Sequence, residues 1–140
     1  MDSIARVDQL PQGVPIYLFG AGTGGRLIHE ALRRNRRVRV AGFIDNAKNG
    51  SRIGELPVLD LAGFAAIRTP GTRVVIASQY VEEISAQLRQ AGIEDAADGS
   101  PLVRHLVEAR VHAAERRRLA LISAAMMPVM VLAGWALFTA

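Results

Sequence analysis

Three glycines near the start of the chain have the spacing of a phosphate-binding turn. Gly20, Gly22 and Gly25 fit the pattern G-x-G-x-x-G. In such a turn the first glycine permits a tight bend, the second lets a pyrophosphate approach the backbone, and the third lets a helix pack closely on a strand. Thr23 begins the helical pattern that follows, and a helix N-terminus offers unpaired N–H groups to an anion. The stretch therefore predicts a nucleotide site at Gly20, Gly22, Thr23 and Gly25.

Further polar residues follow two of the predicted strands. Asp45 lies twenty residues beyond Gly25, where an acid is expected to hydrogen-bond ribose hydroxyls. Ser78 and Tyr80 follow a third apolar stretch, at the rim where ligands bind to open parallel sheets. A structural interpretation is also open: the glycines would only turn the chain, and Asp45 and Asn46 would cap the next turn through their own backbone.

The elements that must position these residues form an α/β pattern. Apolar stretches at 16–19, 38–45 and 73–78 predict three parallel strands, with one short extended piece at 56–59. Helical periodicity starts at Thr23 and again at Val81, where Gly92 ends it, and a short helix is expected at 61–67. We expect a leader at 1–14, a small Rossmann-like domain at 15–99 and, within it, a linker at 93–99.

The last part of the chain predicts a membrane anchor. Ser100-Pro101 is a helix start, so residues 100–118 should form a juxtamembrane helix. Residues 119–140 contain no charged side chain, and this length of helix spans a bilayer. Arg116–Arg118 precede the segment, which places the domain at the cytoplasmic face of a bacterial inner membrane and the C-terminus outside. The alternative is a buried helix of a soluble oligomer.

Composition excludes several other site types. The chain has no cysteine, so it has neither disulfides nor thiolate metal sites. The histidines His29, His105 and His112 are scattered, so no metal site is expected. The net charge of +4 comes almost entirely from arginine, and its densest group is Arg33, Arg34, Arg36, Arg37 and Arg39. No aromatic residue lies among them to stack on bases, so we expect a solvated helix end or attraction to anionic lipids, and no nucleic-acid partner.

The motifs "YLFGAGTGGRLIHEAL", "VAGFIDNA", "IGELPVLDL" and "VVIASQYVEEISAQL" resemble the N-terminal Rossmann-like domain of sugar-nucleotide enzymes. These enzymes are the polysaccharide-biosynthesis epimerases and dehydratases and the amino-sugar acetyltransferases. The resemblance covers about residues 15–93 and implies that Gly20, Gly22 and Asp45 lie near a nucleotide. The catalytic parts of these families are missing: Tyr80 is followed four residues later by Ile84 instead of lysine, and no hexapeptide repeat is present.

The sequence thus leads to two functional hypotheses. In the first, the protein is a membrane-anchored, non-catalytic module that binds NAD or a nucleotide sugar within a larger assembly. In the second, it is a structural single-span accessory subunit of a membrane complex whose glycine turn stays empty. Both expect membrane lipids and other membrane subunits as partners of the C-terminal helix. Neither expects catalysis, because no nucleophile–base pair can be assembled from the residues around the turn.

Overall fold

The computed structural model describes residues 1–138 of the chain and the side chains of residues 1–126. The chain divides into two compact units, Met1–Leu106 and Val107–Ala140. The first unit is a mixed α/β domain that contains the sheet and all the helices before α4. Helix α4 (Ser100–Phe138) begins in the first unit and supplies the regular structure described for the second.

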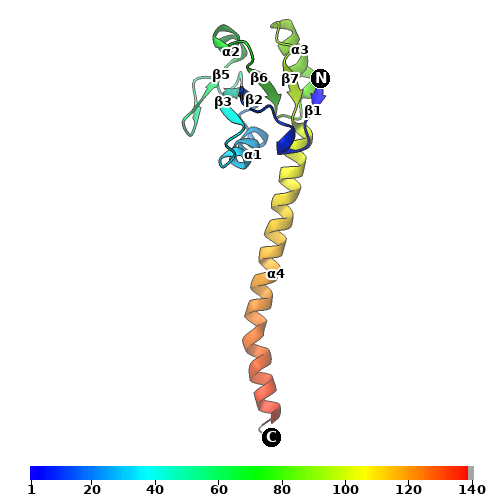
Figure 1. The fold of residues 1–140 in the computed structure, drawn as a ribbon. Coiled ribbons are helices and arrows are strands. Elements are labelled where there is room, and N and C mark those ends of the chain that lie inside the picture. The colour runs from blue at the N-terminus through cyan, green and yellow to red at the C-terminus, as the bar shows by residue number, and fades with distance from the viewer. Residues whose placement is uncertain (139–140) are drawn as a thin grey trace. The chain divides into compact units, whose positions relative to one another are not determined.

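A seven-stranded sheet forms the centre of the first unit (Figure 1). Its strands are β1 (Asp2–Ser3), β2 (Pro15–Phe19), β3 (Arg39–Ile44), β4 (Arg52–Ile53), β5 (Leu56–Leu59), β6 (Arg73–Ile76) and β7 (Ala96–Asp98), in the order β1-β7-β6-β2-β3-β5-β4. All pairs are parallel except β4 with β5. The inner strands β5-β3-β2-β6-β7 therefore have the order of a doubly wound sheet, and the direction of winding reverses between β2 and β6.

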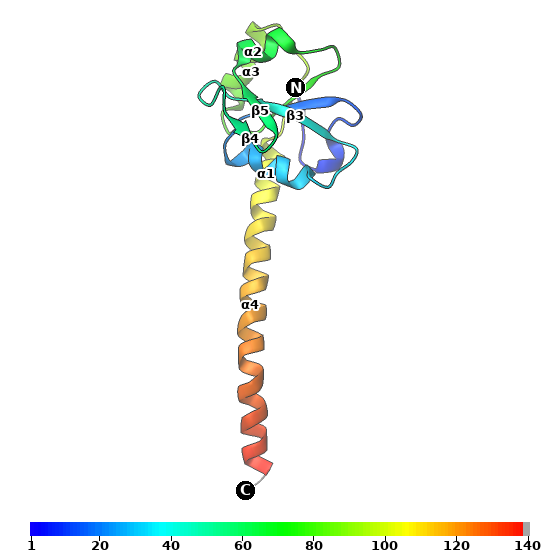
Figure 2. The same cartoon turned by 90° about the vertical axis from the view of Figure 1, so that its left-hand side faces the viewer.

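Helices cover both faces of this sheet, as the two views in Figures 1 and 2 show. Helix α1 (Thr23–Leu32) and the first turns of α4 bury Ile28 and Leu102 in one core cluster. Helices α2 (Leu61–Ile67) and α3 (Val81–Gln90) bury Phe64 and Leu88 in the other. Alternate residues of β2 point to the two clusters, as the period of a strand requires. A short 3-10 helix, η1 (Val7–Gln9), precedes the first long strand.

Local sequence signals account for the helix limits on the second face. The carboxylate of Asp60 accepts the N–H of Gly63 at 2.7 Å and so caps α2. Glu82 and Glu83 lie in the first turn of α3, where the helix dipole favours acids. Gly92 follows α3 with φ of 72°, a conformation that suits glycine. The predicted helices at 61–67 and from Val81 are thus confirmed.

The sheet is larger than the sequence predicts. Three strands and one extended piece were expected, whereas the sheet also contains β7, β1 and β4. Strand β7 lies inside the expected linker at 93–99, and β1 lies in the expected leader. These strands have three residues or fewer, and β7 consists of Ala-Ala-Asp, so they carry no alternation of apolar and polar residues. Pairing with neighbouring strands, and not local sequence, makes them extended.

Helix α4 contains the start of the predicted membrane span. Among the residues whose side chains the structure describes, no helix is both long and apolar enough to cross a bilayer. From residue 127 onward the predicted span 119–140 lies outside those residues. The membrane span therefore stays a prediction from the sequence.

Candidate functional site

A hollow of about 870 Å³ lies at the carboxyl ends of β2 and β6. This is the point where the winding of the sheet reverses, and open α/β sheets bind ligands there. We call it the glycine-turn pocket; it is lined by Gly20, Gly22, Thr23, Gly24, Asp45, Lys48, Ala77, Ser78, Gln79, Tyr80, Ser100, Val103 and Arg104. All the residues predicted from the sequence to bind a nucleotide are in this set except Gly25.

The glycines of the turn have different structural roles. Gly20 has φ of 115°, which only glycine adopts readily. At Gly25 a methyl group would overlap the carbonyl oxygen of Gly20, so this residue lets α1 pack directly on the turn. At Gly22 a methyl group would meet no atom within 4 Å, and φ there is −87°. Gly22 is thus the position where a side chain costs the fold least and points into open space.

The N-terminus of α1 opens onto the pocket. Gly22 is the residue that precedes the helix, and no side chain caps its first turn. The first N–H groups of a helix have no partner within the helix, and the dipole makes this end positive. Thr23 and Gly24 line the pocket at this point. The arrangement suits an anion such as a phosphate.

Asp45 braces the glycine turn. Its Oδ2 accepts the N–H of Ala21 at 3.0 Å. Its Oδ1 accepts the N–H groups of Ala47 at 3.0 Å and Lys48 at 3.2 Å. The carboxylate therefore joins the turn after β2 to the turn after β3, and it also caps the second of these as the structural interpretation expected. It lines the pocket as well, so the predicted contact with a ribose stays a prediction.

Two cations also line the pocket. Lys48 is exposed and its Nζ donates to the carbonyl oxygen of Ala21 at 3.3 Å. Arg104 is exposed on the second turn of α4. The only carboxylate in the lining is Asp45, and it already accepts three backbone N–H groups. The charge balance of the lining therefore favours a negatively charged ligand.

Hydroxyl and aromatic groups complete the rim. Ser78 follows β6, and its Oγ accepts the N–H of Tyr80 at 3.2 Å. Tyr80 is 59% exposed, so its ring is free to stack on a planar group. Ser100, at the start of α4, brings a second hydroxyl group to the lining. Together these groups provide polar and aromatic contacts beside the cations.

Sequence reasoning missed Lys48, Ser100 and Arg104 as members of this site. Lys48 follows Asp45 by three residues and is the only lysine, which is a local signal that could have identified it. Arg104 is more than eighty residues from Gly20, and no pattern in the sequence relates the two. Only the packing of α4 beside α1, seen in the approach of Val103 to Gly24, brings Arg104 to the pocket.

No histidine is among the residues that line the pocket. His29 is on α1, with its ring edge-on to Phe43 at a centroid distance of 5.7 Å. Burial lowers the pKa of His29, and the charge of Arg33 adds to the effect. His105 Nδ1 lies 2.9 Å from the carbonyl oxygen of Ala5. Within the described residues, no group of three or more acidic, histidine or cysteine side chains could hold a metal ion.

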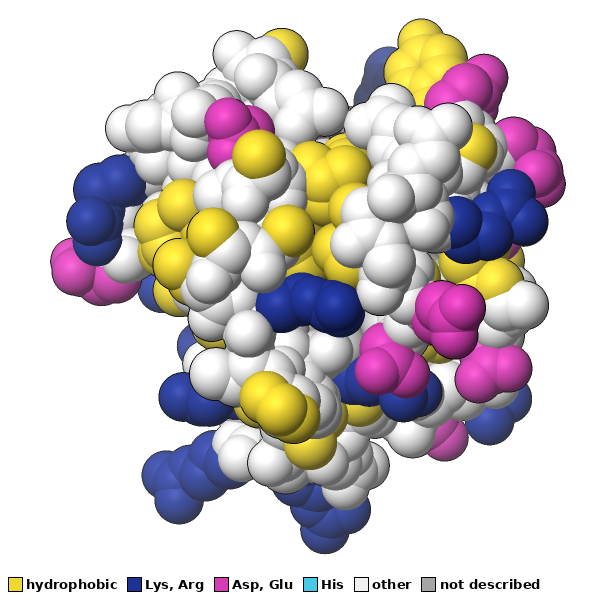
Figure 3. Space-filling view, turned by 90° about the horizontal axis from the view of Figure 1, so that it is seen from above, with side chains coloured by type: hydrophobic (Ala, Val, Ile, Leu, Met, Phe, Trp, Pro, Cys, Tyr) yellow, Lys and Arg dark blue, Asp and Glu magenta, His cyan; other side chains and the backbone are white. Residues whose placement is uncertain are grey.

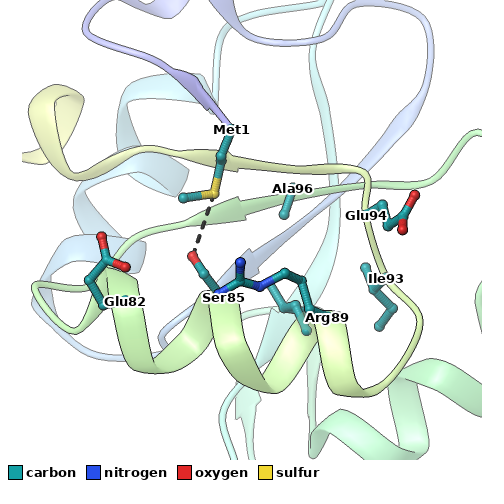
Figure 4. A pocket seen from close by; sticks show the side chains of 8 residues that line it. Met1, Glu82, Ser85, Arg89, Ile93, Glu94 and Ala96 are labelled. Atoms are coloured by element: carbon teal, nitrogen blue, oxygen red, sulfur yellow. Dashed lines mark hydrogen bonds between the residues drawn. The ribbon is translucent and has the colours of Figure 1, made fainter.

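A second hollow, of about 430 Å³, lies between α3, β7 and the N-terminal residues. Figure 4 shows Met1 and Ser85 close together there, and the hydroxyl of Ser85 donates to the Met1 sulfur at 3.6 Å. Glu82 and Glu94 lie at opposite ends of this hollow in the same view. Its charged groups do not converge on one point, so it is a weaker candidate for a binding site than the glycine-turn pocket.

The side of the domain formed by α2 and α3 is shown from above in Figure 3. Hydrophobic side chains are visible in a depression there, and charged side chains stand around it. Partly buried residues that pack on the core at this side include Leu61 and Val81. They are the outer layer of the second core cluster and bring no functional polar group with them.

No protein-family model matches the chain, and no curated protein matches its sequence. The resemblance to domains of sugar-nucleotide enzymes therefore stays a prediction from the motifs themselves.

Proposed function

We propose that residues 15–99, with the first turns of α4, form a Rossmann-like module that binds a nucleotide or nucleotide sugar. The main support for the proposal is the glycine-turn pocket. An uncapped helix N-terminus and two cations line one hollow at the point where the winding of the sheet reverses. Gly22 adds room for a phosphate beside the backbone. These features correspond to the way dinucleotide sites hold a pyrophosphate.

The geometry favours recognition of phosphate over recognition of ribose. Asp45, the residue expected at the ribose, already accepts three backbone N–H groups, whereas the N–H groups of the first turn of α1 are uncapped. Lys48 and Arg104 add two positive charges to the same lining. A nucleoside diphosphate, alone or as part of NAD or a sugar nucleotide, is therefore the ligand class that we propose.

We further propose that the module binds its ligand without transforming it. Among the residues that line the pocket, Ser78, Ser100 and Tyr80 carry hydroxyl groups, but the lining contains no histidine and its one carboxylate is held by backbone N–H groups. General acid–base chemistry needs a group in hydrogen-bond reach of the reacting proton and with a suitable pKa. Lys48 and Tyr80 also line the pocket, but Lys48 Nζ already donates to the carbonyl oxygen of Ala21, and the structure shows no hydrogen bond between these two described side chains.

The membrane anchor completes the proposal and comes from the sequence. Residues 119–140 lack charge and follow Arg116–Arg118, which favours insertion with the domain on the cytoplasmic side. A single span in a larger assembly would make the module a sensor or a carrier of a nucleotide at the membrane surface. Partners of the C-terminal helix would then be lipids and other membrane subunits.

The second candidate function is a structural accessory subunit with an empty turn. Asp45 favours it, because a carboxylate that holds two turns together has a structural role without any ligand. Calorimetric titration of the full chain in detergent micelles with NAD, ADP and UDP-sugars decides between the two candidates. Saturable binding below millimolar concentration supports the nucleotide module, and the absence of binding by all these ligands supports the structural subunit.

A further inference from the structure

A dense group of basic side chains lies where α1 ends and β3 begins. Five arginines occur within seven residues there, and all five are exposed: Arg33, Arg34, Arg36, Arg37 and Arg39. We call them the arginine surface. The two remaining residues of the stretch are Asn35 and Val38, so no carboxylate interrupts it. Glu30, one turn earlier on α1, is the nearest acid in the sequence.

The arginine surface is separate from the glycine-turn pocket. Arg39 is the first residue of β3, and Asp45 follows its last residue. The six residues of β3 span roughly 20 Å at about 3.3 Å per residue. Arg39 pairs with Pro15 at the start of β2, whereas the glycine turn follows the end of β2. The arginine surface and the glycine-turn pocket thus lie at opposite ends of strands β2 and β3.

Hydrogen bonds to backbone groups hold the loop between α1 and β3, which carries most of these arginines. The side-chain oxygen of Asn35 accepts the N–H groups of Arg37 at 2.8 Å and Val38 at 3.2 Å. The N–H of Gly13 donates to the carbonyl oxygen of Arg37 at 3.1 Å. These bonds use no guanidinium group. The fold therefore presents the charges on an ordered loop, which lowers the entropy cost of binding a partner.

Guanidinium groups in such a cluster bind phosphates well. Each presents planar N–H donors that pair with two phosphate oxygens at once. Near an anionic bilayer each basic residue contributes about fivefold in affinity, as converted from about 1 kcal/mol. The stretch contains no aromatic side chain for base stacking, which speaks against single-stranded nucleic acid.

We propose that the arginine surface binds the phosphate headgroups of an anionic membrane. The choice of a membrane over other polyanions rests on the anchor in the proposed function, since residues 119–140 would keep the chain at a bilayer. A tethered surface meets its lipid at high effective concentration, so modest affinity is enough. The contact is additional to nucleotide binding, because the two sites share no residue.

The test uses the full chain in vesicles of phosphatidylcholine, alone or mixed with phosphatidylglycerol. The chain has no cysteine, so Ala31→Cys places one donor fluorophore on an exposed residue of α1. Energy transfer to an acceptor lipid headgroup then reports the approach of this end of α1 to the membrane. Glu83→Cys, on α3, provides the control position. The test variant is the triple change Arg36→Gln, Arg37→Gln and Arg39→Gln, and its matched control is Arg52→Gln, Arg68→Gln and Arg89→Gln.

We expect phosphatidylglycerol to increase transfer from position 31, and the increase to be lost in the triple test variant but kept in its matched control. High salt should also abolish it, because salt screens exposed charges. Equal transfer in both vesicle types would overturn the proposal, and so would binding of duplex DNA through these arginines without a lipid effect. If the wild type does not float with phosphatidylcholine vesicles, the anchor has failed. Flotation with phosphatidylglycerol vesicles then tests the arginine surface by itself. If the chain shows no salt-sensitive flotation with these vesicles, the proposal for the arginine surface is overturned.

Discussion

The Oδ2 atom of Asp45 accepts the backbone N–H of Ala21 at 3.0 Å, across 24 residues of sequence. Ala21 lies inside the glycine turn and is fully buried, and Asp45 follows β3. The bond therefore fixes the turn relative to the neighbouring strand. An acid at this position of a βαβ unit is expected to contact a ribose. In this structure Asp45 instead accepts a hydrogen bond from the glycine turn.

Replacement of Asp45 should reduce stability even without a ligand. Asp45→Ala removes the acceptor of three backbone N–H groups, so we expect a loss of about 1–3 kcal/mol in the free energy of unfolding. Asp45→Asn should lose less, because one oxygen remains as an acceptor. Urea unfolding of the full chain measures both. The bracing role is refuted if Asp45→Ala unfolds at the same urea concentration as the wild type.

The glycines of the turn should respond differently to the same substitution. Gly25→Ala would place a methyl group on the carbonyl oxygen of Gly20, so we expect a loss of roughly 1–3 kcal/mol or more in stability. Gly22→Ala meets no atom and should leave stability unchanged or raise it by about 0.4–1 kcal/mol. Thermal unfolding of the two variants is the measurement. A larger loss at Gly22 than at Gly25 would contradict these roles.

Stability should depend on the protonation of His29. Burial lowers the pKa of His29 in the folded chain below its ordinary value of 6.5. The unfolded chain therefore binds the proton more tightly, and stability should fall as the pH drops through 6.5 toward the lower folded pKa. Above 6.5 the imidazole is neutral in both states and this contribution is constant. Comparing urea unfolding of the wild type and His29→Gln across this range checks the effect; equal pH profiles would exclude it.

The orientation of the chain can be tested in cells. Arg116–Arg118 before an uncharged segment predict that an N-terminal tag stays inside and a C-terminal tag is exposed. Protease added to intact spheroplasts should remove only the C-terminal tag, and lysis should make both accessible. Cleavage of the N-terminal tag in intact spheroplasts would reverse the predicted orientation.

Periodicity and turn residues predicted the parts of the fold with strong local signals. The strand before the glycine turn, helix α1 after it, and the short helix at 61–67 all carry such patterns. Strand β7 does not, because Ala96 and Ala97 are small and the acids Glu94 and Asp95 precede them. Its extended form depends on pairing with β6, which is a long-range interaction.

The sequence predicted the glycines of the site but not its cations. Spacing identified Gly20, Gly22 and Gly25, because each step of a tight turn constrains the residue type. Arg104 reaches the pocket only because the start of α4 packs beside α1, and no local rule encodes that contact. The hydrogen-bond partners of Asp45 could not be predicted from the sequence either. Its position suggests a ligand contact, whereas its carboxylate accepts three backbone N–H groups.

Ligand binding by a series of Gly22 variants shows whether the glycine turn holds a phosphate. The wild type, Gly22→Ala and Gly22→Leu are titrated calorimetrically as full chains in micelles with NAD, ADP and UDP-sugars, and Ala31→Leu, on an exposed site of α1 away from the pocket, is the control. We expect one of these ligands to bind the wild type and the control equally. Affinity should then fall as the side chain at position 22 grows, while the unfolding temperature stays near that of the wild type. Equal binding by Gly22→Leu and the wild type, or no binding of any ligand by the wild type, would contradict a phosphate held at the glycine turn.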